Sequence, residues 1–103
     1  MTTVKTRCGK DRYEIIAKGH ATGSVAGCGY ISGLLYSLAG YLVNAEGICL
    51  DRRRMEPGDV VLRFRGGERA RAAYDMTLIG LKQLERSHPE LIRVTEDTFP
   101  YEE

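Results

Sequence analysis

The chain has 103 residues, 43% of them hydrophobic, which predicts a single domain over residues 1–103 with one core. Its formal net charge is +1, so we do not expect a nucleic-acid binder, whose domain is usually clearly basic. We see no apolar run near the ~20 residues that cross a membrane and no signal peptide at the N-terminus, so we expect a cytoplasmic protein without membrane contact.

Two strands open the chain. Apolar and small side chains alternate with charged ones over residues 3–8 and again over 12–18, which is typical of half-buried strands. Residues 9–11 between them read as a hairpin turn. The stretch 19–27, GHATGSVAG, is rich in glycine and predicts a loop.

A helix is expected from residue 28 to about residue 44. One apolar stripe runs along it, formed by Ile31, Leu34, Leu35, Leu38 and Leu42. A second stripe holds only small residues, Gly29, Gly33, Ser37 and Gly40. Three glycines cost a helix about 1 kcal/mol each against alanine. The small stripe therefore predicts a close packing contact, either with the sheet of the same domain or across a dimer.

The second half of the chain is predicted to hold three strands and one helix. Strands are expected over 48–54 and 60–65, joined by a Pro-Gly turn at 56–59. A second helix over 68–87 and a short strand over 91–95 complete the chain. The resulting ββαββαβ order predicts an α+β two-layer sandwich, with about five strands in a mixed sheet and two helices on one face. The pattern leaves the order of the strands in the sheet open.

Cys28 and His20 form a candidate catalytic pair. Unpaired N–H groups and the helix dipole favour a thiolate at a helix start, which is where we place Cys28. The glycine-rich loop that holds His20 is long enough to fold back toward the sulfur. The histidine could then take the thiol proton and later protonate a leaving amine, while the N–H groups stabilise an oxyanion. A buried structural cysteine with a structural histidine explains the same residues, so both interpretations stay open.

Other polar and sulfur-bearing residues have plain alternatives. Ser32, one helical turn after Cys28, could bond near the sulfur or fill a packing contact. Cys8 and Cys49 lie in strands and are expected to be inert. An odd number of widely spaced cysteines, without C-x-x-C or H-x-x-x-H, predicts no disulfide scaffold, metal or cofactor. Arginines gather in residues 52–71 and could contact RNA phosphates or an acidic protein, although a solvated strand face is the commoner origin.

Two blocks of sequence carry a resemblance to a known family. Gly19-His20-Ala21, a glycine-rich loop and Cys28-Gly29-Tyr30-Ile31-Ser32 resemble the ribosomal-processing cysteine protease (Prp) family, which pairs G-H-A with C-[AG]-x-x-S at a helix start. Residues 80–84, GLKQL, and 89–94, PELIRV, are similar to that family's second helix and last strand. The resemblance covers nearly the whole chain in element order.

This resemblance implies a cysteine endopeptidase with Cys28 as nucleophile and His20 as general base. The family removes the N-terminal extension of a bacterial large-subunit ribosomal protein and acts as a homodimer. The resemblance also implies a loop that closes on the peptide, with substrate-binding residues at Gly23, Ser24, Gly27 and Ser32.

The sequence departs from the family pattern between His20 and Cys28. This interval is several residues shorter than the family's, and the acidic residue usually found before the cysteine is absent from residues 24–27. A shorter loop alters the substrate pocket, and a missing carboxylate leaves the histidine less firmly oriented. The alternative function is therefore a catalytically inactive relative that acts as a ribosome-associated or peptide-binding module.

Overall fold

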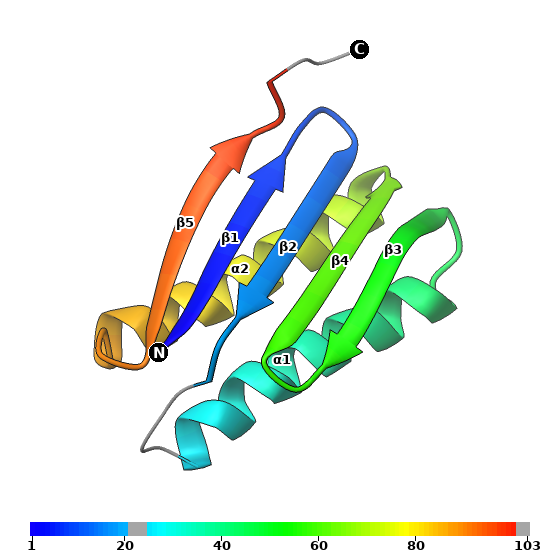
Figure 1. The fold of residues 1–103 in the computed structure, drawn as a ribbon. Helices are drawn as coiled ribbons and strands as arrows, with labels where there is room; N and C mark the ends of the chain where they lie inside the picture. The colour runs from blue at the N-terminus through cyan, green and yellow to red at the C-terminus, as the bar shows by residue number, and fades with distance from the viewer. Residues whose placement is uncertain (21–24, 101–103) are drawn as a thin grey trace.

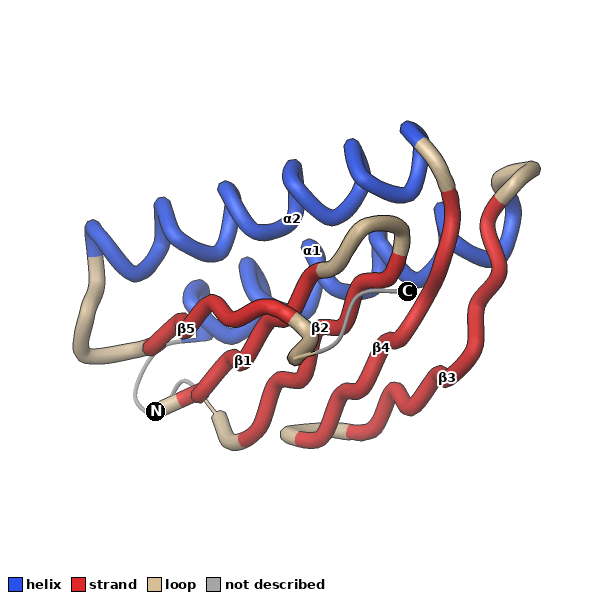
Figure 2. Tube along the Cα trace, turned by 90° about the horizontal axis from the view of Figure 1, so that it is seen from above, coloured by secondary structure: helices blue, strands red, loops and turns tan. Residues whose placement is uncertain are grey.

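Five strands and two helices follow one another in the predicted ββαββαβ order in a computed structural model that describes residues 1–20 and 25–100. They are β1 (Thr2–Cys8), β2 (Arg12–Lys18), α1 (Val25–Asn44), β3 (Ile48–Glu56), β4 (Asp59–Gly66), α2 (Glu68–Ser87) and β5 (Ile92–Thr98). Both helices lie behind the sheet in Figure 1, and Figure 2 shows the two layers from above. The predicted α+β two-layer sandwich is confirmed.

The sheet is mixed, with the strand order β3-β4-β2-β1-β5. Neighbouring strands pair antiparallel except β1 and β5, which run parallel from the pair Thr2↔Ile92 to the pair Cys8↔Thr98. The first strand of the chain therefore lies beside the last one. This is the part of the topology that the sequence pattern left open.

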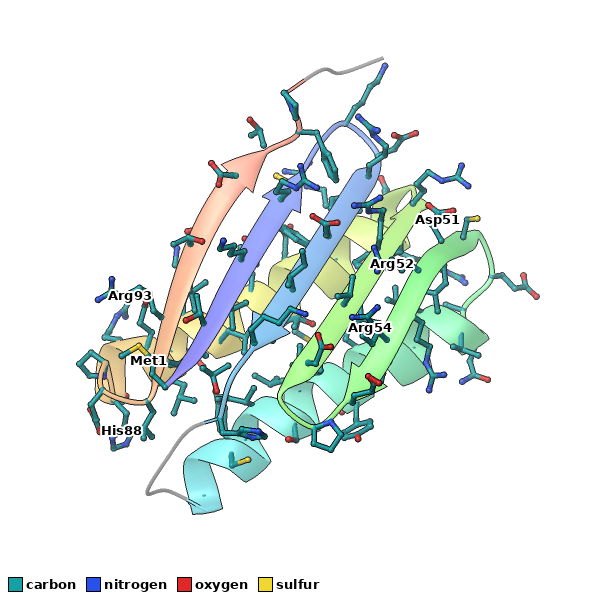
Figure 3. All side chains as sticks on the ribbon, viewed as in Figure 1. Met1, Asp51, Arg52, Arg54, His88 and Arg93 are labelled. Atoms are coloured by element: carbon teal, nitrogen blue, oxygen red, sulfur yellow. The ribbon has the colours of Figure 1, made fainter. Side chains whose placement is uncertain are left out.

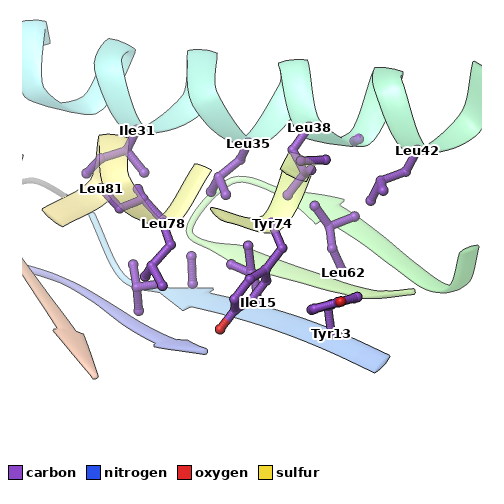
Figure 4. Close-up of a cluster of buried hydrophobic side chains, with 14 of the residues drawn as sticks. Tyr13, Ile15, Ile31, Leu35, Leu38, Leu42, Leu62, Tyr74, Leu78 and Leu81 are labelled. Atoms are coloured by element: carbon purple, nitrogen blue, oxygen red, sulfur yellow. The ribbon is translucent and has the colours of Figure 1, made fainter. Parts of the chain in front are cut away.

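The core fills the space between the sheet and the helices (Figure 4). The alternating side chains of the strands meet the apolar stripes of both helices. The buried residues include Ile15, Leu62 and Phe64 from the sheet, Ile31, Leu35, Leu38 and Leu42 from α1, and Leu78 and Leu81 from α2. Burial of the apolar stripe of α1 explains why this glycine-containing helix is stable, since packing outweighs propensity.

Two element boundaries differ from the prediction. Helix α1 begins at Val25, three residues before the predicted start, because its first turn contains Gly27 and carries no helix signal in the sequence. Strand β5 continues to Thr98 instead of ending at residue 95. Its last residues are polar and exposed, so apolar alternation does not reveal them, but they pair with β1 throughout.

The side of α1 that points away from the sheet is exposed. We call this the α1 outer face; it consists of Gly29, Gly33, Tyr36, Ser37, Gly40 and Val43. Tyr36 and Val43 are each 60% exposed. Within the described residues, a Cβ added to any of these three glycines would meet no atom within 4 Å. The small stripe does not pack on the sheet of its own chain. Of the two predicted contacts, the one with the sheet of the same domain is therefore wrong.

The composition of α1 also corrects the expectation that no segment is long and apolar enough to cross a membrane. By length and composition alone, its segment Ala26–Asn44 is long and apolar enough to cross a membrane, contrary to the sequence-based prediction. In this fold the same segment buries its apolar stripe against the sheet.

Candidate active site

A small pocket lies between the end of β2, the turn that joins β3 to β4, and the first half of α1. Its volume is about 70 Å³, room for a few water molecules. His20, Cys28 and Ser32 all line it, so three of the predicted site residues meet in one place. Ile31 and Leu35 add apolar walls, and Tyr36, which belongs to the α1 outer face, also lines the edge of the pocket.

His20 is placed by the β3–β4 turn. The backbone amide of Gly19 donates a hydrogen bond of 3.0 Å to the carbonyl oxygen of Gly58 in this turn. The His20 ring then lies directly on Gly58, where an added Cβ would be 2.5 Å from Nε2. Gly58 has φ +69°, which favours glycine at this turn position. The imidazole is exposed to solvent on its other side.

Cys28 is half-buried in the first turn of α1 and packs against the core. The sequence predicted that Cys28 is the first residue of the helix. Because the helix begins at Val25, Cys28 is instead its fourth residue. Ser32 follows one turn later, is half-buried and shares the pocket. The sulfur therefore faces the pocket from one side of the helix, with the hydroxyl of Ser32 further along the same side.

Three further residues were predicted to bind the substrate, Gly23, Ser24 and Gly27. Gly23 and Ser24 fall outside the described residues. Gly27 is buried and lines a second, wider depression on the opposite side of α1, together with Tyr30 and the end of α2. The structure thus joins Ser32, but not Gly27, to the pocket of His20 and Cys28.

Two carboxylates that the sequence analysis missed also line the pocket. Glu56 and Asp59 flank the Pro57-Gly58 turn. Asp59 forms ion pairs with Lys18 and with Arg54, the latter at 3.1 Å. The hydrogen bond from Lys18 is the main cause that lowers the pKa of the Asp59 carboxyl, so Asp59 carries a negative charge near neutral pH.

Only the pairing of two distant strands places Asp59 at the pocket, and no local sequence pattern predicts this pairing. Lys18 and Asp59 are register partners in β2 and β4, although 41 positions separate them. This pairing brings the turn beside the strand end that leads into His20. The chain lacks a carboxylate just before the cysteine, but the pocket does not lack negative charge.

The other cysteines stand apart from this pocket. Cys8 is half-buried at the end of β1, and Cys49 is exposed on β3, where Arg65 and Asp51 contact its sulfur at 3.0 and 3.4 Å. In the described part of the chain, no three His, Cys, Asp or Glu side chains gather in a way that could hold a metal ion.

No protein-family profile and no curated protein sequence matches the chain. Solved structures do resemble it, among them the following two. The essential ribosomal processing protease Prp from S. aureus, in complex with a covalently linked product peptide, superposes with a TM-score of 0.81 at 19% identity, covering 93% of this chain and 99% of that one. SMU.848 from Streptococcus mutans superposes with a TM-score of 0.69 at 20% identity, covering 96% and 99%. The chain has the Prp fold.

Proposed function

We propose that this chain is a cysteine endopeptidase with Cys28 as nucleophile and His20 as general base. The observation that carries this proposal is the shared pocket of His20, Cys28 and Ser32. The fold supports it, because the protein from S. aureus with the same fold is a protease holding a covalently linked product peptide.

The pocket chemistry follows the usual thiol mechanism. The Cys28 sulfur attacks the peptide carbonyl carbon while the His20 imidazole accepts the thiol proton. The partial positive charge at the start of α1 favours the oxyanion that develops. His20 then returns the proton to the leaving amine, and a water molecule hydrolyses the remaining thioester with His20 again as base.

We further propose an N-terminal extension of a ribosomal protein as the substrate, cut in the cytoplasm. The support is the printed role of the S. aureus protein in ribosomal processing, together with the G-H-A and C-G-x-x-S motifs of this sequence. The small pocket volume suits a short side chain of an extended peptide at the cleavage position.

The test is cleavage of peptides that carry ribosomal-protein N-terminal extensions. We expect the unmodified protein and a Cys49→Ala control to cleave one of them and Cys28→Ala to be inactive. Cys49 is a suitable control because it is an exposed cysteine that does not line the pocket. Cleavage that persists in Cys28→Ala rejects the mechanism. Peptide binding without cleavage by the unmodified protein would instead favour the peptide-binding module.

We also propose that two copies pair through the α1 outer face. Small residues permit close helix approach, and exposed Tyr36 and Val43 supply apolar surface that a second copy would cover. Gly33→Glu should give monomers in sedimentation at concentrations where the unmodified protein is a dimer. Ile79→Glu, which places the same charge on the exposed side of α2, should leave the dimer intact. A monomeric unmodified protein at high concentration contradicts the proposal.

A further inference from the structure

The sheet has one face that no helix covers, turned toward the viewer in Figures 1 and 3. We call it the open face; strand register assigns its side chains. The three inner strands contribute Lys5, Arg7, Arg12, Lys18, Arg63 and Arg65. The edge strands add Arg52, Arg54 and Arg93, all three labelled in Figure 3. Its carboxylates are Glu14, Asp51, Glu56, Asp59 and Asp97.

Charge is divided unequally between this face and the rest of the molecule. Nine cations against five carboxylates give the open face a net charge of +4. Because the whole chain carries +1, all the other residues together carry −3. The near-neutral net charge of the whole chain argues against a nucleic-acid binder. The open face, however, has the excess of positive charge that nucleic-acid binders show.

The arginines are concentrated at one end of the open face. Arg12 and Arg65 are register partners on adjacent strands, and Arg63 pairs in register with Glu14. Arg7 and Arg63 both bind the buried Glu14 carboxylate, while Arg65 binds Asp51 at 2.7 and 2.9 Å. These carboxylates hold the guanidinium groups in fixed positions, so less conformational entropy is lost when the arginines bind a ligand.

The fixed arginines still have donors to offer. In each of Arg7, Arg63 and Arg65 the carboxylate contacts involve Nε and Nη2, and the Nη1 group makes no hydrogen bond with the described residues. Lys5 and Arg52 are exposed and have no carboxylate partner in the described part of the chain. Arginine forks match phosphate oxygens in geometry as well as charge.

An aromatic ring stands among these arginines. The ring centroid of Phe99 lies 4.6 Å from the guanidinium carbons of both Arg7 and Arg12, and the three residues line one depression with Arg63 and Arg65. Guanidinium planes and aromatic rings are the surfaces on which unpaired bases stack. An acidic peptide would use the charges but not this stacking surface, so the observations favour single-stranded RNA.

We propose that the open face binds the phosphate backbone of single-stranded RNA. This proposal does not depend on the peptidase activity. If both hold, RNA on the open face would reach the Lys18 and Arg54 end, which adjoins the pocket of His20, and would hold the enzyme on an RNA-bound substrate.

The first measurement is binding of a labelled oligouridylate by fluorescence anisotropy at several salt concentrations. Four phosphate contacts give a slope of log affinity against log salt of about −2.8, so affinity should fall about 50-fold between 50 and 200 mM salt. Absence of binding, or binding that salt does not weaken, overturns the proposal. Stronger binding of polyglutamate than of RNA also overturns it and indicates an acidic protein partner.

Two double variants with the same total charge separate the open face from general electrostatics. Lys5→Glu with Arg52→Glu brings the open face from +4 to zero, whereas Arg69→Glu with Arg86→Glu leaves it at +4. All four residues are exposed, and both variants lower the net charge of the chain from +1 to −3. We expect the first to lose RNA binding and its salt slope and the second to keep both. Equal losses in the two variants reject the open face as the site.

Discussion

Replacing Gly58 by alanine should disable the candidate active site through His20. An alanine Cβ at this position would lie 2.5 Å from Nε2 and 2.8 Å from Cε1 of the imidazole, whereas ordinary contact begins near 3.4 Å. The ring must therefore move by about 1 Å, and a misplacement of that size can cost about 10²-fold in rate. The positive φ of +69° adds roughly 1–2 kcal/mol of backbone strain in any L-residue.

The glycine at position 47 provides a matched control for this strain. Gly47 has φ +80°, close to that of Gly58, yet a Cβ added to it meets nothing within 4 Å in the described structure. Gly47→Ala should thus lower the melting temperature about as much as Gly58→Ala without touching His20. Any difference in function between the two variants then reports on the imidazole and not on stability.

The assay compares kcat and KM for peptide cleavage in both variants, together with thermal denaturation and the NMR signals of the His20 ring. We expect Gly58→Ala to reduce kcat about 100-fold and to shift the imidazole signals, and Gly47→Ala to change neither. Equal kcat values in the two alanine variants would refute the idea that the β3–β4 turn positions His20. Shifted imidazole signals with unchanged kcat would show that His20 moves but is not the base.

Three further predictions concern stability. Burial opposes the charge of Glu14, but hydrogen bonds from Arg63 and Arg7 outweigh burial and lower the pKa of this carboxyl. The stability of the fold should therefore be full above the unfolded pKa of about 4 and fall as the pH drops below it. Glu14→Gln should remove this acid sensitivity in urea titrations, at a cost of about 2 kcal/mol in the free energy of unfolding. Phe64→Ala should cost about 3–5 kcal/mol by chemical denaturation, because the ring is 0% exposed; a loss under 1 kcal/mol would contradict the assigned core. Burial raises the pKa of Tyr74 to about 12 from 10.0, so stability should decline between these pH values and decline less in Tyr74→Phe; an equal decline would reject this cause.

The sequence predicted most elements because alternation and helical periodicity survive in this fold. Strand β2 and helix α2 begin and end where the pattern places them. The first turn of α1 and the end of β5 were missed because distant parts of the chain stabilise them. Tertiary packing makes a helix of a glycine-containing turn, and pairing with β1 makes a strand of exposed polar residues. Neither force is visible in a local window of sequence.

The sequence predicted only the part of the candidate site whose residues are close together in the chain. His20, Cys28 and Ser32 are close in the chain, so the sequence alone could predict that they share one site. Gly58 and Asp59 reach the pocket only through the pairing of β2 with β4, which composition and spacing do not encode. The net charge of the chain is a single total, so it cannot show how cations and carboxylates are distributed over the faces of the fold.

The parallel pairing of β1 with β5 has a consequence for how this chain folds. The contact between Thr2 and Ile92 spans nearly the full length of the chain, so a large loop-closure entropy must be lost before this contact can contribute to stability. We expect the hairpins and helices to collapse first and β5 to dock last, which makes folding slow for a protein of this size. Until then β1 is an unprotected edge beside β2, and a chain cut short before Ile92 would keep that edge open to aggregation.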